Sequence, residues 1–592
     1  MTLVDILIVA AYILASILIG IWFSKKAGQS KDAFFLAGRS APWWLIGVSM
    51  AATNFSVDTP IAIVETVYSE GIAGVWFVWA GLISVSLVSF VFARLWRRSG
   101  VMTDVELTEL RYDGQSAAVL RVLKGLYFGA IFNIFIVGWV FLAMYKMIQG
   151  LTPFNPIWIL GFLAAVALFY SASGGFYSVL VTDMMQYVIA LLGSIFLAAA
   201  ALYEVGGITT LVTKLNERTT GTTDTTSFLP TFGEDGTMPF VVLGTYLTVQ
   251  WWANKYADGG GKHIQRMLSA RSERDAVGGS FLYAILNYTL QIWPWILVAL
   301  CSMVLLDPSE QSDSMQVYSK TMTKVLPIGL LGLCVTGLVG AFMSTIDTHL
   351  HLGASYLVND IYRRFLVKGA DDKHYVAASR VAMGLILIMS IGLSISMDSV
   401  VGAWKFLLTF AGGAGATWII RWFWWRANAW TEFSGMLASG ICATALQAIF
   451  PDWHYTSRLL VTVAVSTLTW LIVTLLTPPT SDEQLVVFAK RVRPGRMGWG
   501  RIYDLAGIDR TKDIGVLGRN LMSVLLGITF LLGLCFSIGQ LIFGEVFSSL
   551  VLAMIALVAG LVLYRLEQNR VSIEITTKDH EPSTLEKMQE QI

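Results

Sequence analysis

The sequence predicts an all-α protein that crosses a membrane many times, and three observations support this prediction. The chain has 592 residues, of which 55% are hydrophobic and only 14% are charged, whereas an ordinary soluble domain carries about 25% charged residues. About fifteen apolar segments approach the length of a helix that spans a bilayer. Two of these segments are interrupted by polar residues, which indicates unwound backbone at membrane depth.

The predicted membrane segments follow one another along most of the chain. Their boundaries, taken from hydropathy, are Leu3–Phe23, Ala41–Thr66, Val75–Leu95, Val119–Met147, Pro156–Ser171, Val181–Leu202, Phe240–Trp252, Ala276–Leu306, Ile328–Leu357, Val376–Met397, Val401–Trp424, Phe433–Phe450, Leu459–Leu476, Leu521–Phe543 and Val546–Tyr564.

Basic residues gather in alternate connections between these segments. They follow the first, third, seventh, ninth and eleventh segments, and they are dense in the longest internal polar loop, Thr480–Asn520. The positive-inside rule places such connections in the cytoplasm. The chain is therefore predicted to be a multi-pass protein of the plasma (inner) membrane, with its N-terminus outside and its C-terminus in the cytoplasm.

The first interrupted segment, Gly47–Val64, carries polar residues and a proline at its centre. The second, Phe240–Trp252, passes into the sequence NKYADGGGKH. Transporters use half-helix ends and unwound carbonyls of this kind to hold ions and solutes near the midplane. The alternative is a proline kink in the first segment and a re-entrant loop in the second.

The two interrupted segments are five positions apart in the order of segments. An inverted repeat of five plus five helices would pair segments two to six with segments seven to eleven, and each repeat would begin with a broken helix. We infer this repeat from hydropathy spacing alone.

The ninth segment carries a dense polar cluster within Gly340–His351. Ala341, Ser344, Thr345 and Thr348 fall along one helical stripe because they are three or four residues apart. Small residues with hydroxyl groups also serve close helix packing, which is the alternative explanation. The ionisable residue in this cluster, Asp347, favours a functional role because a charge inside a membrane is costly.

Other polar residues leave open choices. Asp183 follows Gly174 and Gly175, where an acid would complement the dipole at a helix N-terminus. His349 and His351 suggest a metal, but residues two apart on a helix point in different directions and no third ligand is in view. The chain has no HExxH or GxSxG motif, so we do not expect an enzyme.

Five stretches of this chain, taken in order, resemble the sodium–solute symporter family, which includes the sodium–glucose, proline and sialic-acid transporters. The resemblance runs from about Lys31 to Trp425. The stretches are MAATNFSVDTP, ARLWRRSGVMTDVELTELRY, SGGFYSVLVTDMMQ, QRMLSARSERDA and GAFMSTIDTHLHLGASYLVNDIYRR. This resemblance implies a leucine-transporter-like inverted repeat with extra helices at both ends.

The resemblance also implies an organisation of the chain into six parts. These are an N-terminal extra helix (1–30), the inverted-repeat transport core (31–425), additional helices (426–478), a basic cytoplasmic loop (479–520), a C-terminal helix pair (521–566) and a cytoplasmic tail (567–592).

The resemblance implies a main sodium site built from five oxygen atoms. Ala52 and Phe55 would supply carbonyls from the first broken helix. Ala341 would supply a third carbonyl, and Ser344 and Thr345 would supply hydroxyls. Five oxygens without a fixed anion suit weak and reversible binding of a small hard cation.

Some members of the family carry a second sodium site, and the matching positions here are Asp183, Ser344, Asp347 and Thr348. Asp347 departs from the hydroxyl that is usual at its position. Two carboxylates in close proximity either bind a cation more strongly or share a proton. We therefore predict a second cation or proton site near Asp183 and Asp347.

The solute pocket matches the sugar transporters poorly. Sugar-transporting members place an acid and a serine around a tryptophan, whereas Trp79 here lies between Val78 and nearby Gly81. A tryptophan-rich pocket suits apolar or cationic groups, with Asp58 as a counter-charge. The alternative for the tryptophans is an interfacial belt or core packing. The candidate pocket residues are Asn54, Asp58, Thr59, Trp76, Trp79, Trp251, Trp252, Asn254 and Tyr256.

The resemblance implies sodium-coupled symport of a small organic solute by alternating access. Sodium would be the coupling ion, and no organic cofactor is expected. The expected partners are the solute and the lipid bilayer, with no nucleic acid, while the oligomeric state and the solute stay open. Two alternatives remain, a proton-coupled symporter of the same fold and a sensor that does not transport.

Overall fold

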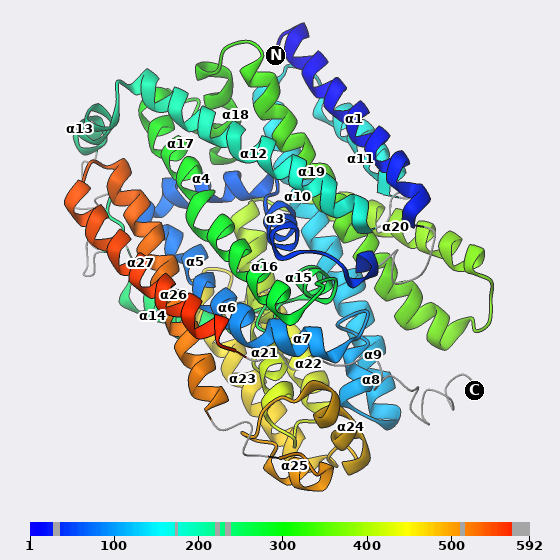
Figure 1. The fold of residues 1–592 in the computed structure, drawn as a ribbon. Helices are drawn as coiled ribbons and strands as arrows, with labels where there is room; N and C mark the ends of the chain where they lie inside the picture. Colours follow the sequence, from blue (N-terminus) through cyan, green and yellow to red (C-terminus); the bar gives the residue numbers. More distant parts are fainter. Residues whose placement is uncertain (28–35, 172–175, 219–224, 231–237, 510–514, 571–592) are drawn as a thin grey trace.

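The computed structural model describes residues 1–27, 36–171, 176–218, 225–230, 238–509 and 515–570 (Figure 1). In this part of the chain every regular secondary-structure element is a helix, and the only isolated β-bridge joins Ala41 to Ala270. Parts of three predictions lie outside the described residues: the end of the N-terminal region (28–30), part of the basic loop (510–514) and most of the C-terminal tail (571–592).

The predicted apolar segments are helical, and further helices lie in the connections between them. In chain order the principal helices are α1 (Leu3–Ala27), α3 (Trp43–Asn54), α4 (Asp58–Glu70), α5 (Trp76–Trp79), α6 (Gly81–Leu87), α7 (Ala93–Ser99), α8 (Leu107–Arg111), α9 (Gly114–Leu126), α10 (Asn133–Leu151), α11 (Pro156–Ser171), α12 (Phe176–Val205), α13 (Ile208–Arg218), α14 (Phe240–Thr245), α15 (Gly261–Leu268), α16 (Glu273–Ile285), α17 (Ile292–Leu305), α18 (Ser314–Val325), α19 (Leu330–Ser355), α20 (Asp372–Ser394), α21 (Val400–Phe423), α22 (Ala429–Ile449), α23 (Tyr455–Leu476), α24 (Asp482–Val492), α25 (Gly500–Ala506), α26 (Val516–Ile542) and α27 (Val546–Gln568). Among the helices in the connections are α8, α13, α18, α24 and α25.

Nine helical stretches among the described residues are long and apolar enough to cross a membrane. Three shorter apolar helices, at Leu3–Leu18, Pro156–Leu168 and Phe240–Gln250, add to them. Several stretches run through π-helical turns, η3 (Val88–Phe92), η4 (Tyr127–Phe132), η5 (Tyr246–Gln250), η6 (Leu286–Leu290) and η7 (Tyr356–Leu366). The chain is thus a multi-pass helical protein, while the total of about fifteen crossings stays a prediction.

The first interrupted segment is a broken helix, formed by α3 and α4. The backbone leaves the helical conformation at Phe55, where φ is −77° and ψ is 97°. Thr59 satisfies the freed backbone, because its hydroxyl donates to the Asn54 carbonyl at 3.1 Å and its amide donates to the Ser56 carbonyl at 3.2 Å. This local pairing lets the polar break persist inside an apolar bundle.

The second interrupted segment is also broken, between η5 and α15. Gly259 and Gly260 have φ values of +130° and +67° before α15 begins, a conformation that a side chain would oppose. Helix α21 covers the unwound stretch at very short range. A Cβ added to Gly415 of α21 would lie 2.1 Å from the Trp252 carbonyl oxygen and 2.8 Å from the Asn254 amide nitrogen.

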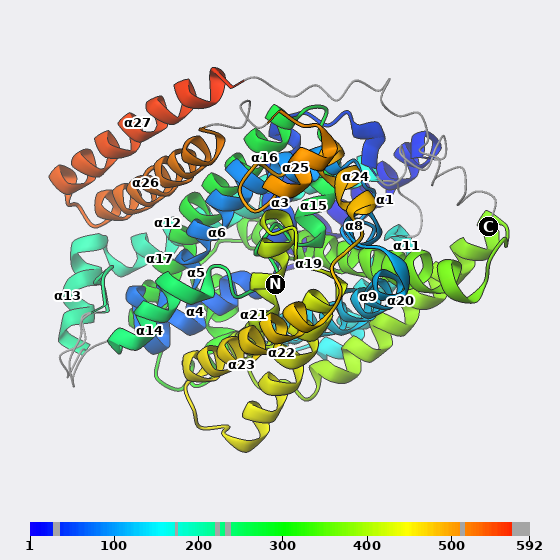
Figure 2. The same cartoon turned by 90° about the horizontal axis from the view of Figure 1, so that it is seen from below.

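The two broken helices lie near the centre of the molecule, among the other membrane helices. Helix α3 packs against α12, α15, α16 and α19. Its contact with α16 is close because a Cβ on Gly47 would lie 2.8 Å from the Gly279 carbonyl oxygen. Seen from below, α26 and α27 form one edge of the molecule and α22 and α23 another, with α3 and α15 between them (Figure 2).

The N-terminal extra helix docks on α19 through a buried carboxylate. Asp5 Oδ1 accepts hydrogen bonds from the amides of Gly329 and Gly332 at 2.8 and 2.9 Å. These amides lie at the start of α19, where backbone donors have no partner within the helix. Asp5 therefore caps α19 from another element, and α1 is fixed to the core by a specific contact.

The C-terminal pair and the basic loop also pack against the core. In the contact between α26 and α27, Ser549 Oγ donates to the Ser537 carbonyl at 2.9 Å. In the loop, Gln484 of α24 donates to the Glu109 and Leu110 carbonyls at 2.9 and 2.8 Å. The loop predicted as basic and cytoplasmic thus contains two helices, α24 and α25, and the first of them is bonded to α8.

Candidate functional site

A cavity of about 280 Å³ lies between the two helix breaks. Both unwound stretches contribute to its wall, together with residues of α6, η3, η4, α10, α16, η6, α19 and α21. Its wall combines aromatic and aliphatic side chains with about as many polar ones, so it offers a small molecule both apolar surface and hydrogen-bonding groups. The π-helical turns η3, η4, η5 and η6 all border it, and such turns are frequent at functional sites.

The structure brings six of the nine predicted solute residues to this cavity. They are Asn54, Asp58, Thr59, Trp251, Asn254 and Tyr256. The other three, Trp76, Trp79 and Trp252, are not among the lining residues. Trp76 and Trp79 pack against Phe536 of α26, with ring centroids 5.7 and 5.2 Å apart. Trp252 donates from its indole to the Thr248 carbonyl at 2.8 Å.

The polar predicted residues are held by specific bonds at the breaks. The Asn54 amide donates to the Tyr283 hydroxyl. The Asn254 amide donates to the Gln250 and Trp251 carbonyls at 2.9 and 2.8 Å, while its oxygen accepts from the Tyr256 amide at 2.7 Å. Asn254 therefore fixes the shape of the unwound loop.

Asp58 is the first residue of α4 and its side chain is buried in the cavity wall. Its Oδ2 accepts a hydrogen bond from the Trp404 indole at 3.2 Å. A carboxylate in the first turn of a helix is also stabilised by the helix dipole. These two interactions compensate part of the negative charge of Asp58 from within the protein.

Three basic residues of the cavity wall were not predicted from the sequence, namely Lys255, Lys262 and His263, and His349 was considered only as a metal ligand. The first three lie within the sequence NKYADGGGKH, so the only available signal was their position at a helix break. Lys262 donates to the Thr53 carbonyl at 3.2 Å, which ties α15 to the C-terminal end of α3. His349 Nδ1 lies 2.6 Å from Asn133 Oδ1.

The five residues predicted for the main sodium site are all buried. Ala52 lies on α3 and Phe55 directly follows that helix, while the other three lie on α19, which packs against α3. Ser344 Oγ donates to Asp183 Oδ1 at 2.8 Å, and Thr345 Oγ1 donates to the Ala341 carbonyl at 2.9 Å. Each hydroxyl gives its hydrogen to a protein acceptor, so its lone pairs remain available for a cation. Thr345 also lines the central cavity.

The residues predicted for the second cation or proton site have basic partners of their own. Asp183 Oδ2 accepts from Arg266 Nη2 at 3.0 Å and from Ser49 Oγ at 2.6 Å, in a fully buried cluster. Asp347 Oδ1 lies 3.4 Å from His351 Nε2. Among the described residues, no group of three His, Cys, Asp or Glu side chains is placed to hold a metal ion.

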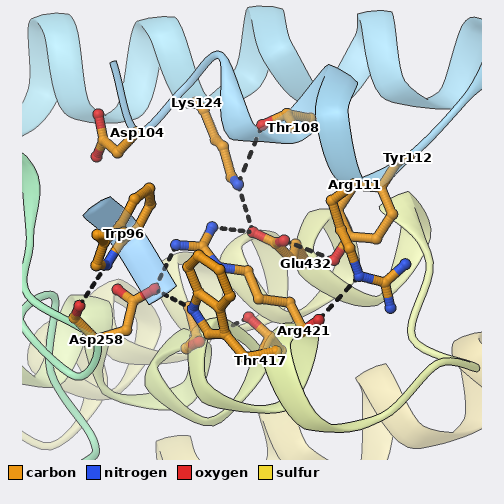
Figure 3. Close-up of polar contacts among 12 residues, drawn as sticks. Trp96, Asp104, Thr108, Arg111, Tyr112, Lys124, Asp258, Thr417, Arg421 and Glu432 are labelled. Atoms are coloured by element: carbon orange, nitrogen blue, oxygen red, sulfur yellow. Dashed lines mark hydrogen bonds and ion pairs between the residues drawn. The ribbon is translucent and has the colours of Figure 1, made fainter. Parts of the chain in front are cut away.

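A network of buried charges lies next to the second helix break (Figure 3). We call Asp258, Lys124, Arg421 and Glu432 the buried ion-pair network. Arg421 pairs with Asp258 and, at 3.4 Å, with Glu432, while Lys124 Nζ lies 2.5 Å from Glu432. Asp258 belongs to the second break, so the network ties the unwound loop to α9, α21 and α22.

Two neighbouring residues complete this network. The Tyr112 hydroxyl donates to Glu432 Oε1 at 2.7 Å. Arg111 donates to the Arg421 carbonyl at 2.9 Å, in the last turn of α21 (Figure 3). It also donates to the Ala427 carbonyl at 3.1 Å, just beyond the end of α21. Exposed carbonyls at a helix C-terminus carry partial negative charge, which suits a guanidinium.

The arrangement of two broken helices around a central cavity defines a membrane transporter of the inverted-repeat class. The sequence profile described as the sodium:solute symporter family matches residues 34–439, which is more than half of the chain. The chain therefore belongs to the sodium:solute symporter family, and the resemblance inferred from its motifs is confirmed.

Individual proteins extend this comparison. The chain is 25% identical over 463 residues to the sodium/glucose cotransporter of Vibrio parahaemolyticus, covering 74% of this chain and 84% of that protein. It is 25% identical over 505 residues to the sodium/mannose cotransporter of Bos taurus, covering 77% and 80% of the two chains.

A solved structure confirms the fold. The substrate-bound, outward-open structure of a sodium-coupled sialic acid symporter aligns with a TM-score of 0.66 at 20% identity, over 81% of this chain and 99% of that chain. The predicted leucine-transporter-like fold is thus confirmed. Membership of the sodium:solute symporter family confirms sodium-coupled symport of a small solute by alternating access as the activity of this membrane-embedded chain.

Proposed function

We propose that the cavity between the two helix breaks is the solute site of this symporter. We also propose that sodium binds beside it, at the Ala52, Phe55 and Ala341 carbonyls and the Ser344 and Thr345 hydroxyls. The observation that carries this proposal is the position of Thr345, which belongs to the predicted sodium set and also lines the cavity. Cation and solute would therefore bind next to each other, across the contact between the first broken helix and α19.

This position explains how binding of sodium would be coupled to binding of solute. A cation held between α3 and α19 would fix the first break, and Asn54, Asp58 and Thr59 of that break face the solute. A ligand that orders a site lowers the free-energy cost of ordering it for a second ligand. Each ligand would then raise the affinity of the other by the same factor.

Thermal stability of the purified protein tests the sodium site. We expect a higher Tm in sodium chloride than in choline chloride for the wild type, and loss of this difference in Ser344→Ala. Ser390→Ala is the matched control, because Ser390 is a buried serine of α20 that bonds only to the Ile386 carbonyl of its own helix among the contacts described. A sodium-dependent difference that survives Ser344→Ala would contradict the site.

The same protein in proteoliposomes separates transport from sensing. Solute uptake driven by a sodium gradient is the expected result. Uptake driven by a proton gradient alone would support proton coupling, and binding of solute without net uptake would support a sensor. Neither outcome is expected of a member of the sodium:solute symporter family.

The second cation or proton site near Asp183, Ser344, Asp347 and Thr348 is a separate proposal. A cation at Asp183 would compete with the Arg266 guanidinium for the same carboxylate oxygens. A proton at Asp347 would release His351. If Asp347 titrates during transport, Asp347→Asn will alter the pH dependence of sodium-driven uptake, and an unchanged pH profile would exclude Asp347.

We further propose that the N-terminus lies outside and that α24 and α25 lie in the cytoplasm, in the plasma (inner) membrane. The N-terminus and the α24–α25 pair lie at opposite ends of the molecule (Figure 1), and basic residues are dense around these two helices. Single cysteines at exposed Ser309 and Met497 test this orientation. A membrane-impermeant maleimide should label Ser309→Cys from outside and Met497→Cys only after the membrane is opened.

A further inference from the structure

The ionised groups of the central cavity do not balance. Among its lining residues, all of which the structure describes, there are two ammonium groups, on Lys255 and Lys262, and one carboxylate, on Asp58. With neutral histidines and with both lysines protonated, one positive charge is in excess. An uncompensated charge inside a membrane protein is costly and is retained where it has a function.

The excess positive charge lies at Lys255. Lys262 donates to the Thr53 carbonyl, at the C-terminal end of α3. The Lys255 ammonium lies over two aromatic rings, 4.9 Å from the centroid of Phe132 and 4.7 Å from that of Tyr256. Within the described residues, no carboxylate lies within 4.0 Å of the Lys255 ammonium.

The backbone around Lys255 adds to the positive potential. Helix α15 begins at Gly261, and Gly259, Lys262 and His263 all line the cavity beside that helix start. The first amides of a helix have no partner within the helix and carry partial positive charge. Half-helix N-termini in broken membrane helices are oriented toward the anionic groups of substrates.

The opposite charge in the cavity is partly compensated. Asp58 lies in the first turn of α4 and its Oδ2 accepts from the Trp404 indole, while its Oδ1 has no hydrogen-bond partner among the described residues. A cationic solute would meet this acid together with two lysines. An anionic solute would meet the Lys255 ammonium, which contacts the Phe132 and Tyr256 rings and no carboxylate. The charge distribution favours the anion.

Resting on the proposed solute site, we propose that the transported solute is a small organic carboxylate and that Lys255 is its counter-charge. The cavity of about 280 Å³ suits a small molecule. Phe132, Trp139, Tyr256 and Trp404 of its wall would pack against the organic body of the solute, and the carboxylate would bind the Lys255 ammonium beside the start of α15.

The test compares carboxylates with their own amides, since the two differ in charge and little in size. Purified protein in sodium chloride is titrated with lactate, benzoate and phenylacetate, and with lactamide, benzamide and phenylacetamide, while Tm is recorded. Glucose serves as an uncharged polar probe. At least one carboxylate should raise Tm further, and its amide should bind roughly ten- to hundredfold more weakly, because a charge-assisted bond is lost.

Two variants assign this selectivity to Lys255. Lys255→Met keeps the length of the side chain without its charge and should abolish the preference for the carboxylate, while Lys255→Arg should retain it. Lys405→Met is the control outside the cavity, because Lys405 also lies over aromatic rings, of Phe77 and Tyr455, but pairs with Glu70 at 3.5 Å and is not among the cavity lining residues.

The outcomes separate the two proposals. A sodium-dependent rise in Tm in wild type and Lys255→Met, with the carboxylate preference in wild type alone, supports both. The carboxylate inference is overturned if sodium raises the Tm of the wild type but no carboxylate raises it further. It is also overturned if amides or glucose raise Tm as much as the carboxylates do. In both cases the proposed sodium site is unaffected. If sodium does not raise the Tm of the wild type, the proposed function itself is contradicted.

Discussion

The central cavity and the buried ion-pair network differ in how their charges are matched. In the network each charged side chain has a charged partner: Arg421 pairs with Asp258 and Glu432, and Lys124 pairs with Glu432. In the cavity, Lys255 contacts rings where the network would supply a carboxylate. Both regions border the same unwound loop, so the difference does not arise from distance in the fold.

This difference distinguishes a region that fixes the unwound loop from a region that binds the solute. A matched network of buried charges leaves no charge for a ligand to compensate, so its role is to fix the loop to α9, α21 and α22. A cavity with an unmatched charge and an aromatic wall offers a solute both a charge to pair with and apolar surface to pack against. The two regions therefore predict different responses to substitution, with stability affected in one and ligand selectivity in the other.

Breaking the network should give the largest effect on stability. Glu432→Gln keeps the shape of the side chain but leaves Lys124 buried with no carboxylate at 2.5 Å. Removing one partner of a buried pair costs about 3–5 kcal/mol, because the other charge stays desolvated. We expect a loss of this size in the free energy of unfolding, measured by titration of mixed micelles with a denaturing detergent.

An exposed pair provides the control for this substitution. Lys324 lies 3.4 Å from Glu310, with both side chains 40% exposed. Lys324→Gln should change the free energy of unfolding by less than about 1 kcal/mol, as is usual for surface ion pairs. Equal effects of Glu432→Gln and Lys324→Gln would show that the network does not hold the loop.

Filling the contact between α21 and the unwound loop should give a smaller effect. A Cβ in Gly415→Ala would lie 2.1 Å from the Trp252 carbonyl oxygen, so the loop must shift. Overpacking of this kind costs about 1–3 kcal/mol. We expect a lower Tm together with weaker solute binding, because Asn254 and Tyr256 of the same loop line the cavity.

The matched control is Gly384→Ala in α20. An added Cβ there has no heavy atom within 4 Å, and alanine is the better helix former by about 1 kcal/mol. This variant should be as stable as the wild type or more so, with unchanged solute binding. A normal Tm and normal binding in Gly415→Ala would show that the loop is not held against α21 as described.

Much of the fold could be predicted from the sequence because its signals are local. Runs of apolar residues mark the membrane helices, and the polar interruptions near Asn54 and after Trp252 mark the two breaks. The docking of α24 and α25 could not be predicted in this way. It depends on tertiary contacts such as the bond from the Trp499 indole to the Trp422 carbonyl at 2.8 Å, between residues far apart in the chain.

The candidate site could be predicted in part. Polar residues at a break are directed to the cavity by the break itself, as Asn54 and Asp58 show. Lys255 was not predicted to line the cavity, because the direction of a side chain in an unwound stretch follows no periodicity. It depends on individual backbone dihedrals, such as those of Gly259 and Gly260. Trp79 was predicted to line the pocket, but whether its ring faces the cavity or α26 depends on a helix near the other end of the chain.

Substitution of two tryptophans tests which of them belongs to the cavity wall and which to the core packing. These substitutions have the smallest expected effects. Trp404 lines the cavity and donates to Asp58 at 3.2 Å. Trp79 lies outside it, and its indole nitrogen has no hydrogen-bond partner among the described residues. Trp404→Phe leaves Asp58 short of a donor, which should weaken solute binding by about tenfold.

Trp79→Phe removes no hydrogen bond and keeps an aromatic ring against Phe536, so the affinity for the solute should change by less than about twofold. The measurement is the half-saturating concentration of the carboxylate that produces the largest rise in Tm. A larger loss in Trp79→Phe than in Trp404→Phe would reverse the assignment, because Trp79 would then act on the solute from the packing layer behind Val78 and Gly81, which do line the cavity.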